Sequence, residues 1–228
     1  MYSTDLTDAQ WDIIKPLFRG MRRYKWSKRV LVNAVLYINR TGCQWRNLPN
    51  DFPQYKTVFS FYSRACKKGL WDEILVLIVD KTRKKAGRKP SPTYGIVDSQ
   101  SVKTVYSSSC RGIDGGKKIK GRKRHIVVDT MGNLLAVYVH AANLHDTTTG
   151  SVPAINAYIQ YPTIKGFCGD AGYRGTFERE ICDMLTGVKV DISERIKPKN
   201  WMILPKRWVV ERTFGWMIHS RRLSKDYE

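Results

Sequence analysis

Apolar residues recur at helical spacing through the first eighty residues of the chain. Thr7 and Gln10 stand at the spacing of a helix capping box, and Trp11, Ile14 and Leu17 follow on one face. Three more segments have the same periodicity, and the first of them ends near Gly42. We therefore expect four helices, within residues 6–18, 27–45, 54–71 and 71–81.

The periodicity changes after about residue 93. Short apolar runs at 94–98, 164–170 and 188–192 are typical of strands, and the β-branched runs of 125–141 flank a Met-Gly-Asn turn, as in a hairpin. The segments 146–160, 176–185 and 205–223 have helical patterns, whereas 107–124 is a loop rich in Gly, Ser, Lys and Arg. The order β-β-β-α-β-α-β-α predicts an α/β fold with a mixed sheet.

A basic segment separates these two regions. Residues 81–92 hold six Lys or Arg and no acid, together with Gly87 and two prolines. We expect a small all-α domain at 1–80, a basic linker at 81–92 and an α/β domain at 93–228.

The net charge of the chain indicates which kind of molecule it binds. The 228 residues include 40 Lys and Arg against 20 Asp and Glu, which gives a formal net charge of +20. This excess predicts a polyanionic partner, with nucleic acid ahead of an anionic membrane surface. No apolar run is long enough for a membrane span, and the N-terminus lacks the pattern of a signal peptide. The five cysteines form no CxxC pair, which favours buried free thiols and a cytoplasmic location.

Two acids follow apolar runs directly, and a third lies in the final helix. Asp98 ends the first strand of the second region, Asp170 ends "GFCGD", and Glu211 lies in "PKRWVVERTFGWM". Sites in open α/β sheets gather at strand ends of this kind. Three carboxylates brought together need a compensating cation, and oxygen ligands suit Mg²⁺ or Mn²⁺. Two such ions could stabilise the attacking and leaving oxygens of a phosphoryl displacement.

Other acids have simpler interpretations. Asp129 precedes the hairpin turn, where aspartate commonly makes local hydrogen bonds, and Asp191 is a weaker rival of the same kind. His145 and Asp146 stand at a helix start, which favours capping over metal binding. Glu211 could simply pair with Arg207, one helical turn away.

The order of these motifs resembles the DDE transposases of bacterial insertion sequences, in particular the family numbered five. The stretches that carry the resemblance are "LTDAQWDIIKPLF", "RTGCQWRNLP", "VDSQSVKT", "GDAGYRG" and "LPKRWVVERTFGWMIHSRRLSKDYE". The resemblance implies a ribonuclease H-like catalytic domain after a helix-turn-helix-like domain, with the acidic triad on Asp98, Asp170 and Glu211. The family's arginine falls on Arg207. A tyrosine and a lysine found seven residues before and after the glutamate in related transposases are Leu204 and Ile218 here.

The implied activity is metal-dependent cleavage of double-stranded DNA at the element's ends and strand transfer into a target, by a homodimer on DNA associated with the nucleoid. We expect the basic side chains near the acids to contact the DNA backbone, namely Lys117, Lys118, Lys120, Arg122, Lys123, Arg124, Arg207, Arg221 and Arg222. The family usually continues beyond "RRLSKDYE", which suggests a chain truncated at its C-terminus. Two alternatives stay open: a non-catalytic repressor that occupies the element's ends, and a nuclease of the same fold without strand transfer.

Overall fold

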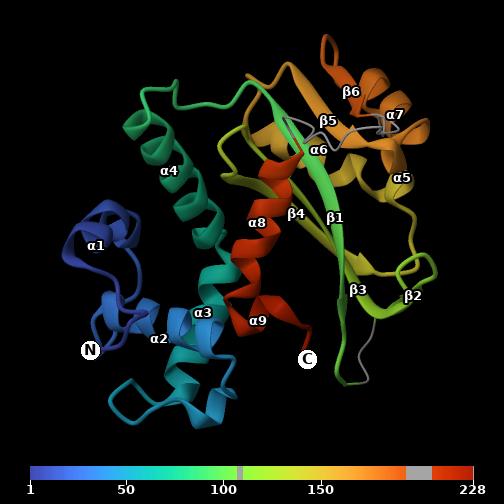
Figure 1. Ribbon diagram of the computed structural model, residues 1–228. Helices are drawn as coiled ribbons and strands as arrows, with labels where there is room; N and C mark the ends of the chain where they lie inside the picture. The colour runs from blue at the N-terminus through green and yellow to red at the C-terminus, as the bar shows by residue number, and fades with distance from the viewer. Residues whose placement is uncertain (107–109, 194–206, 228) are drawn as a thin grey trace. The chain divides into compact units, whose positions relative to one another are not determined.

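The protein is described by a computed structural model that covers residues 1–106, 110–193 and 207–227 (Figure 1). The chain divides into two compact units. Unit 1 contains Met1–Ile78 and Ile218–Ser224, and unit 2 contains Val79–Met217 and Lys225–Glu228. Among the described residues, no helix is long and apolar enough to cross a membrane.

Unit 1 is helical, as predicted. Its elements are α1 (Asp8–Ile14), η1 (Lys15–Phe18), α2 (Lys28–Thr41), η2 (Trp45–Asn47), α3 (Tyr55–Lys67), the start of α4 (Leu70–Lys85) and α9 (Arg221–Ser224). The predicted capping box is present, because the Thr7 hydroxyl accepts from the Gln10 amide and the Gln10 side chain accepts from the Thr7 amide. Leu31, Val58 and Phe61 are almost completely buried in the centre of the unit.

The C-terminal segment differs from the single long helix predicted for 205–223. Helix α8 (Trp208–Ile218) ends at Ile218, and the short α9 lies in unit 1. Gly42 ends α2 in the left-handed conformation, and a Cβ there would lie 2.8 Å from the Arg221 Cβ. Arg222 donates to the Cys43 carbonyl at 3.2 Å. The end of α2 therefore provides the surface on which α9 packs.

Helix α4 extends into the stretch predicted as a linker. It continues to Lys85, and the first proline follows only at Pro90. The buried Arg83 holds this last turn, since its guanidinium pairs with Asp129 at 2.5 Å and its Nε donates to the Lys89 carbonyl. A buried ion pair thus fixes part of a segment whose composition indicated solvent exposure.

Unit 2 is built on a six-stranded mixed sheet. Its strands are β1 (Gly95–Lys103), β2 (Gly112–Asp114), β3 (Ile119–Val128), β4 (Leu134–Ala141), β5 (Gly166–Asp170) and β6 (Lys189–Ser193). The order is β2-β3-β1-β5-β6, with β4 also paired to β3. β3 is antiparallel to β1, β2 and β4, whereas β5 is parallel to both β1 and β6. This mixed sheet with flanking helices confirms the predicted α/β fold class.

Helices cover the sheet on two sides (Figure 1). The elements outside the strands are α5 (Asp146–Thr149), α6 (Ser151–Gln160), η3 (Ala171–Tyr173), α7 (Thr176–Met184) and α8. Val209, Val210 and Phe214 of α8 pack with Ile96 and Ile126 of the sheet. Since side chains alternate along a strand, the even-numbered residues of β1 face α8 and the odd-numbered ones face the other side.

The basic segment before the hairpin is the main departure from the predicted strands. Residues 107–124 were expected to form a loop, but β2 lies within them and β3 begins at Ile119 instead of His125. The antiparallel partner β1 is also longer than predicted and runs to Lys103. Pairing between β1 and β3 gives these polar residues a regular structure that their composition does not indicate.

All five cysteines are free thiols, as predicted. Only Cys168 is buried, however, and Cys66, Cys110 and Cys182 are exposed, so the expectation of buried thiols was wrong for most of them. Cys168 lies in the central part of β5, where its short side chain suits a strand covered on both faces.

Candidate active site on β1, β5 and α8

Asp98 lies in the middle of β1 on the side of the sheet that α8 covers. It is two residues after Ile96, which packs against α8, and it pairs with Ile126 of β3. The amide of Ser99 donates to the Asp98 Oδ1 at 2.7 Å. The strand therefore presents this carboxylate on the face that also carries the helix of Glu211.

Asp170 is the last residue of β5, and the parallel register places it next to β1. Gly95 pairs with Phe167 and Ile96 with Cys168, an offset of 72 residues that also relates Asp98 to Asp170. The Asp170 Oδ1 accepts from the Gly172 amide at 2.8 Å and so caps η3. Parallel pairing thus brings two acids that are distant in sequence to the same level of the sheet.

Glu211 lies in the first turn of α8, and Arg207 connects it to Asp170. The Arg207 Nη2 lies 3.6 Å from the Glu211 Oε1 and 3.7 Å from the Asp170 Oδ2. The Glu211 side chain is 60% exposed and that of Asp170 is 34% exposed, against 23% for Arg207. One guanidinium therefore contacts two of the three predicted acids, and both acids remain accessible to solvent.

Asp98 is electrostatically coupled to the same residues. Burial raises the pKa of Asp98 to about 6, and the charge of Asp170 acts in the same direction. The Ser99 amide, Arg207 and Lys117 oppose this rise in the pKa. A carboxylate that resists ionisation in this way lacks sufficient positive charge around it, as expected of a position prepared for a cation.

Asp170 and Glu211 thus lie beside Arg207, and the charge of Arg207 also acts on Asp98. The three predicted acids are not close enough to one another in this structure to share an ion. No group of three Asp, Glu, His or Cys residues in the described part of the chain is arranged to hold a metal ion. The donor atoms are all carboxylate oxygens, which suit hard divalent cations such as Mg²⁺ and Mn²⁺. Shared ligation by Asp98, Asp170 and Glu211 remains a prediction.

The predicted DNA-binding residues of the basic segment divide into two groups. Lys117, Lys118 and Lys120 are exposed on the β2–β3 turn and the start of β3. Lys123 and Arg124 are buried, at 5% and 7% exposure, which contradicts the expectation that they contact a DNA backbone. They turn inward because β3 has already begun, so that neighbouring residues alternate between its two faces.

The remaining arginines of that prediction have protein partners. The Arg124 Nη2 donates to the Gln100 Oε1 at 2.5 Å, and Arg122 lies 3.3 Å from Asp226. Arg207 contacts the acids of the site, whereas Arg221 and Arg222 belong to α9 in unit 1. Of the nine residues predicted to bind DNA, Lys117, Lys118 and Lys120 are the ones in unit 2 that are exposed.

Asp129 and His145 have the structural roles predicted for them. The Asp129 Oδ1 accepts from the amides of Met131 and Asn133 at 2.9 Å each, which closes the hairpin turn. His145 caps α5 by accepting from the Thr147 amide. Asp129 has a further partner that the sequence did not indicate, because its Oδ2 pairs with Arg83.

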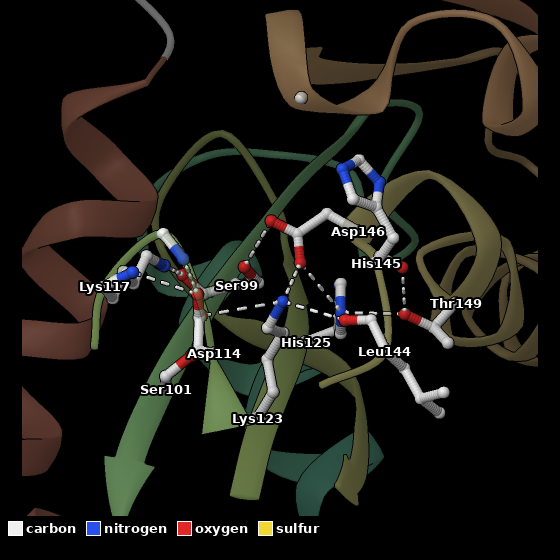
Figure 2. Close-up of polar contacts among 12 residues, drawn as sticks. Ser99, Ser101, Asp114, Lys117, Lys123, His125, Leu144, His145, Asp146 and Thr149 are labelled. Carbon is white, nitrogen blue, oxygen red and sulfur yellow. Dashed lines mark hydrogen bonds and ion pairs between the residues drawn. The ribbon is translucent and has the colours of Figure 1, made fainter. Parts of the chain in front are cut away.

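Asp146 is the polar residue near the site that sequence reasoning missed. It was interpreted as part of a helix cap, but His145 caps α5, and the Asp146 carboxylate instead contacts Lys123 and Ser99 (Figure 2). A short "LHDTT" motif gives no signal for these contacts, because both partners come from distant strands.

Comparison with known proteins assigns the two parts of the chain to transposases. Residues 6–75 match a family described as "Putative transposase of IS4/5 family", and residues 89–228 match the family described as "Transposase DDE domain". The second match covers more than half of the chain. Asp98, Asp170 and Glu211 all lie within the residues that it matches.

Individual relatives cover smaller parts. The chain is 34% identical over 120 residues to the "Putative transposase for insertion sequence element IS402" of Burkholderia cepacia, a match that covers 47% of this chain and 54% of the relative. It is 26% identical over 117 residues to "Uncharacterized protein y4sN" of Sinorhizobium fredii, over 49% of this chain and 87% of that protein. The chain therefore spans about half of the IS402 relative's length.

Solved structures give only a distant likeness. A Mos1 transposase paired-end complex with the left transposon end is 10% identical, with a TM-score of 0.27, over 76% of this chain and 60% of the Mos1 chain. The Mos1 strand transfer complex is 11% identical, with a TM-score of 0.26, over 76% and 59% of the two chains. At these scores the two likenesses carry no argument about the site.

Proposed function

The chain belongs to the family of transposases that carry a DDE domain, and from this premise we propose that it cleaves DNA at the ends of an insertion sequence and joins them to a target. The observation that carries the proposal is the placement of Asp98 and Asp170 on neighbouring parallel strands, with Glu211 linked to Asp170 through Arg207. Polar groups at the ends of parallel strands are where α/β folds place their sites.

The three acids of the candidate site are suitable ligands for a divalent ion. Asp98, Asp170 and Glu211 together with Arg207 carry a formal charge of three acids against one base, and burial together with the charge of Asp170 raises the pKa of Asp98. All three donors are carboxylates, which Mg²⁺ and Mn²⁺ accept as ligands together with waters and phosphate oxygens. Asp98, Asp170 and Glu211 would hold the ions, which supply charge stabilisation for both oxygens of a phosphoryl displacement.

Arg207 has a separate part in the proposal. Its guanidinium already lies beside two of the acids, where it balances their charge and fixes the direction of the Glu211 side chain. A planar guanidinium also donates well to phosphate oxygens. We propose that Arg207 turns from the acids to a DNA phosphate once other positive charge compensates the carboxylates.

The DNA itself would be held by charge. Lys117, Lys118 and Lys120 are exposed on the β2–β3 turn, and Lys117 is close enough to the site to lower the pKa of Asp98. Phosphate contacts of this kind fix the position of a duplex without reading its sequence. Unit 1, which matches the N-terminal transposase family, is the proposed domain for recognition of the element's ends, and a homodimer in the cytoplasm would bring two ends together.

A cleavage assay on DNA that carries the element's terminal repeats tests the proposal. The wild-type chain, incubated with Mg²⁺ or Mn²⁺, should nick this DNA and transfer the freed 3′ end to a target plasmid. Asp98→Asn should bind the same DNA and leave it intact. Binding without cleavage by the wild type supports a repressor, and cutting of unrelated nucleic acid supports a nuclease. Either result contradicts the proposed transposase activity of this chain.

A further inference from the structure

A second polar cluster lies on the side of the sheet opposite Asp98. Ser99 of β1 pairs with His125 of β3, and Ser101 pairs with Lys123. These odd-numbered residues share one face of the sheet, because neighbouring side chains on a strand point to opposite faces. Figure 2 shows Ser99, Lys123 and His125 around the carboxylate of Asp146 at the start of α5, whereas Ser101 lies beside Asp114.

Lys123 is the centre of this cluster. Its ammonium lies 2.8 Å from the Asp146 Oδ1, 2.9 Å from the Leu144 carbonyl and 3.7 Å from the Asp114 Oδ2. The Lys123 side chain is only 7% exposed. A buried ammonium requires partners of this kind, since an uncompensated charge in the interior is strongly unfavourable. We name Ser99, Ser101, Asp114, Lys123 and Asp146 the Asp146 network.

Both carboxylates of the Asp146 network hold β1. The Ser99 hydroxyl donates to the Asp146 Oδ2 at 3.0 Å, and the Ser101 hydroxyl donates to the Asp114 Oδ2 at 2.5 Å. Burial raises the pKa of both acids, but Lys123 outweighs this effect at Asp146, and the Ser101 hydroxyl, the Lys117 amide and Lys123 together outweigh it at Asp114. Both acids therefore stay ionised and accept these bonds. The serine that directly follows Asp98 is thus tied to a buried ion pair.

This hydrogen bond to Ser99 matters because the described pairing of β1 with β5 ends before Asp98. The described pairing of β1 with β5 covers only Gly95 and Ile96. At Ser99 the amide donates to the Asp98 carboxylate, and the carbonyl accepts from the Lys117 ammonium at 3.4 Å. Side chains therefore replace a strand partner here, and on the other face the Ser99 hydroxyl donates to Asp146 and also contacts the Tyr173 hydroxyl.

From this geometry we propose that Asp146, held by Lys123, is a positioning residue that fixes Ser99 and through it the direction of the Asp98 carboxylate. The proposal rests on the proposed function, in which Asp98 holds a divalent ion. Residues that orient a metal ligand from behind commonly change metal affinity by about 10- to 100-fold when they are replaced. A purely structural ion pair would change stability alone.

The chain offers a matched control for that distinction. Arg83 and Asp129 also form a buried ion pair in unit 2, at 2.5 Å, with side-chain exposures of 7% and 0%. Asp129 closes the β3–β4 turn directly after β3, four residues beyond His125, which pairs with Ser99. Asp129→Asn therefore disturbs a comparable ion pair without touching Ser99.

The experiment compares Asp146→Asn, Ser99→Ala and Asp129→Asn in the full chain. The first readout is the concentration of Mn²⁺ that gives half of the metal-induced rise in melting temperature, measured without DNA. We expect this midpoint to rise about tenfold in Asp146→Asn and in Ser99→Ala. The double variant should rise no further than the larger single change, because both substitutions break one connection. Asp129→Asn should melt at a lower temperature with an unchanged midpoint.

The second readout is hydrogen exchange of the Ser99 amide, which needs no metal. Exchange should become faster in Asp146→Asn and in Ser99→Ala, and stay at the wild-type rate in Asp129→Asn when compared at equal distance below each melting temperature. Ser99→Ala keeps every charge in place, so it tests the link even where Asp146→Asn does not fold.

Two results would overturn the inference. One is a Mn²⁺ midpoint within twofold of the wild type in Asp146→Asn and Ser99→Ala, and the other is an equal shift in Asp129→Asn. A wild-type chain without any response to Mn²⁺ contradicts the proposed function instead, and the exchange rates then show whether Asp146 positions Ser99 at all.

Discussion

Asp98 and Asp170 occupy equivalent levels of two neighbouring parallel strands, because the offset that pairs Ile96 with Cys168 also relates the two acids. Their like charges oppose each other, and burial adds to the effect on Asp98. The fold therefore keeps the Asp98 carboxylate at a position that is unfavourable for stability alone. Such a cost is typical of functional sites.

The raised pKa of Asp98 predicts that Asp98→Asn stabilises the protein in the absence of divalent ions. The pKa is about 6 in the folded chain against an ordinary value of 3.8 for aspartate, so the folded state binds the extra proton between these pH values. The free energy of unfolding should therefore fall as pH rises from about 4 to 6 and stay level above that range. At pH 7.5 the substitution should add at most about 3 kcal/mol, the full value that a shift of this size allows.

Urea unfolding in EDTA at pH 4 and pH 7.5 checks this result. The difference between Asp98→Asn and the wild type should be present at pH 7.5 and nearly vanish at pH 4. Glu211→Gln is the comparison, since the Glu211 side chain is 60% exposed and its charge has little effect on stability. A destabilised Asp98→Asn at pH 7.5 would mean that this carboxylate is satisfied by the protein itself.

Arg207 should influence the ionisation of Asp98. Its positive charge lowers the pKa of Asp98, so Arg207→Gln should raise that pKa above its wild-type value. The side-chain carboxyl signals of ¹³C-labelled aspartate, followed by NMR through a pH titration, report the change. Arg212→Gln, on the same helix but hydrogen-bonded to the Met131 carbonyl, should leave the pKa of Asp98 unchanged. Equal pKa values of Asp98 in the wild type and in Arg207→Gln would contradict an electrostatic interaction between Arg207 and Asp98.

The exposed lysines of the β2–β3 turn should contribute to DNA binding through charge alone. Replacing Lys118 and Lys120 by Gln should weaken binding to any duplex and reduce the slope of log affinity against log salt by about 0.9 for each lost phosphate contact. Fluorescence anisotropy at several salt concentrations measures this slope. Lys165→Gln is the control, because this exposed lysine lies before β5, at the opposite end of the strand from Asp170. An equal loss in Lys165→Gln would point to the net charge instead of the turn.

The ion pair between Arg83 and Asp129 should be important for the stability of unit 2. Asp129→Asn leaves the buried guanidinium without its counter-charge, and a loss of about 3–5 kcal/mol in the free energy of unfolding is expected. Urea unfolding at pH 7.5 measures the loss. Lys84→Gln removes an exposed pair with Asp80 on the same helix and should cost less than about 0.5 kcal/mol. Similar losses for both variants would show that the Arg83 environment is open to water.

The sequence could predict the elements of this fold because hydrophobic periodicity depends on local residues. It could also locate Asp98 and Asp170, since each acid is near the end of a buried apolar run. The orientation of the basic segment was beyond such reasoning. Lys123 and Arg124 turn inward only because β3 begins at Ile119, and that start depends on pairing with β1.

Contacts between distant segments were likewise not predictable. The partners of Asp146 come from two different strands, and Arg83 of α4 pairs with Asp129 in the turn between β3 and β4. Each of these pairs depends on sheet register, which a single sequence does not reveal. The capping box of Thr7 and Gln10 was predictable for the opposite reason, because all of its atoms lie within four residues.

Iron-directed cleavage of the polypeptide tests the central claim most directly. Fe²⁺ that replaces Mg²⁺ generates hydroxyl radicals in the presence of ascorbate and peroxide, and these cut the backbone near the ion. We predict cuts close to residues 98, 170 and 211, suppressed by excess Mg²⁺ and lost in Asp98→Asn and Asp170→Asn. Cuts confined to other segments, or cuts at these three positions that persist in both variants, would contradict a shared ion site.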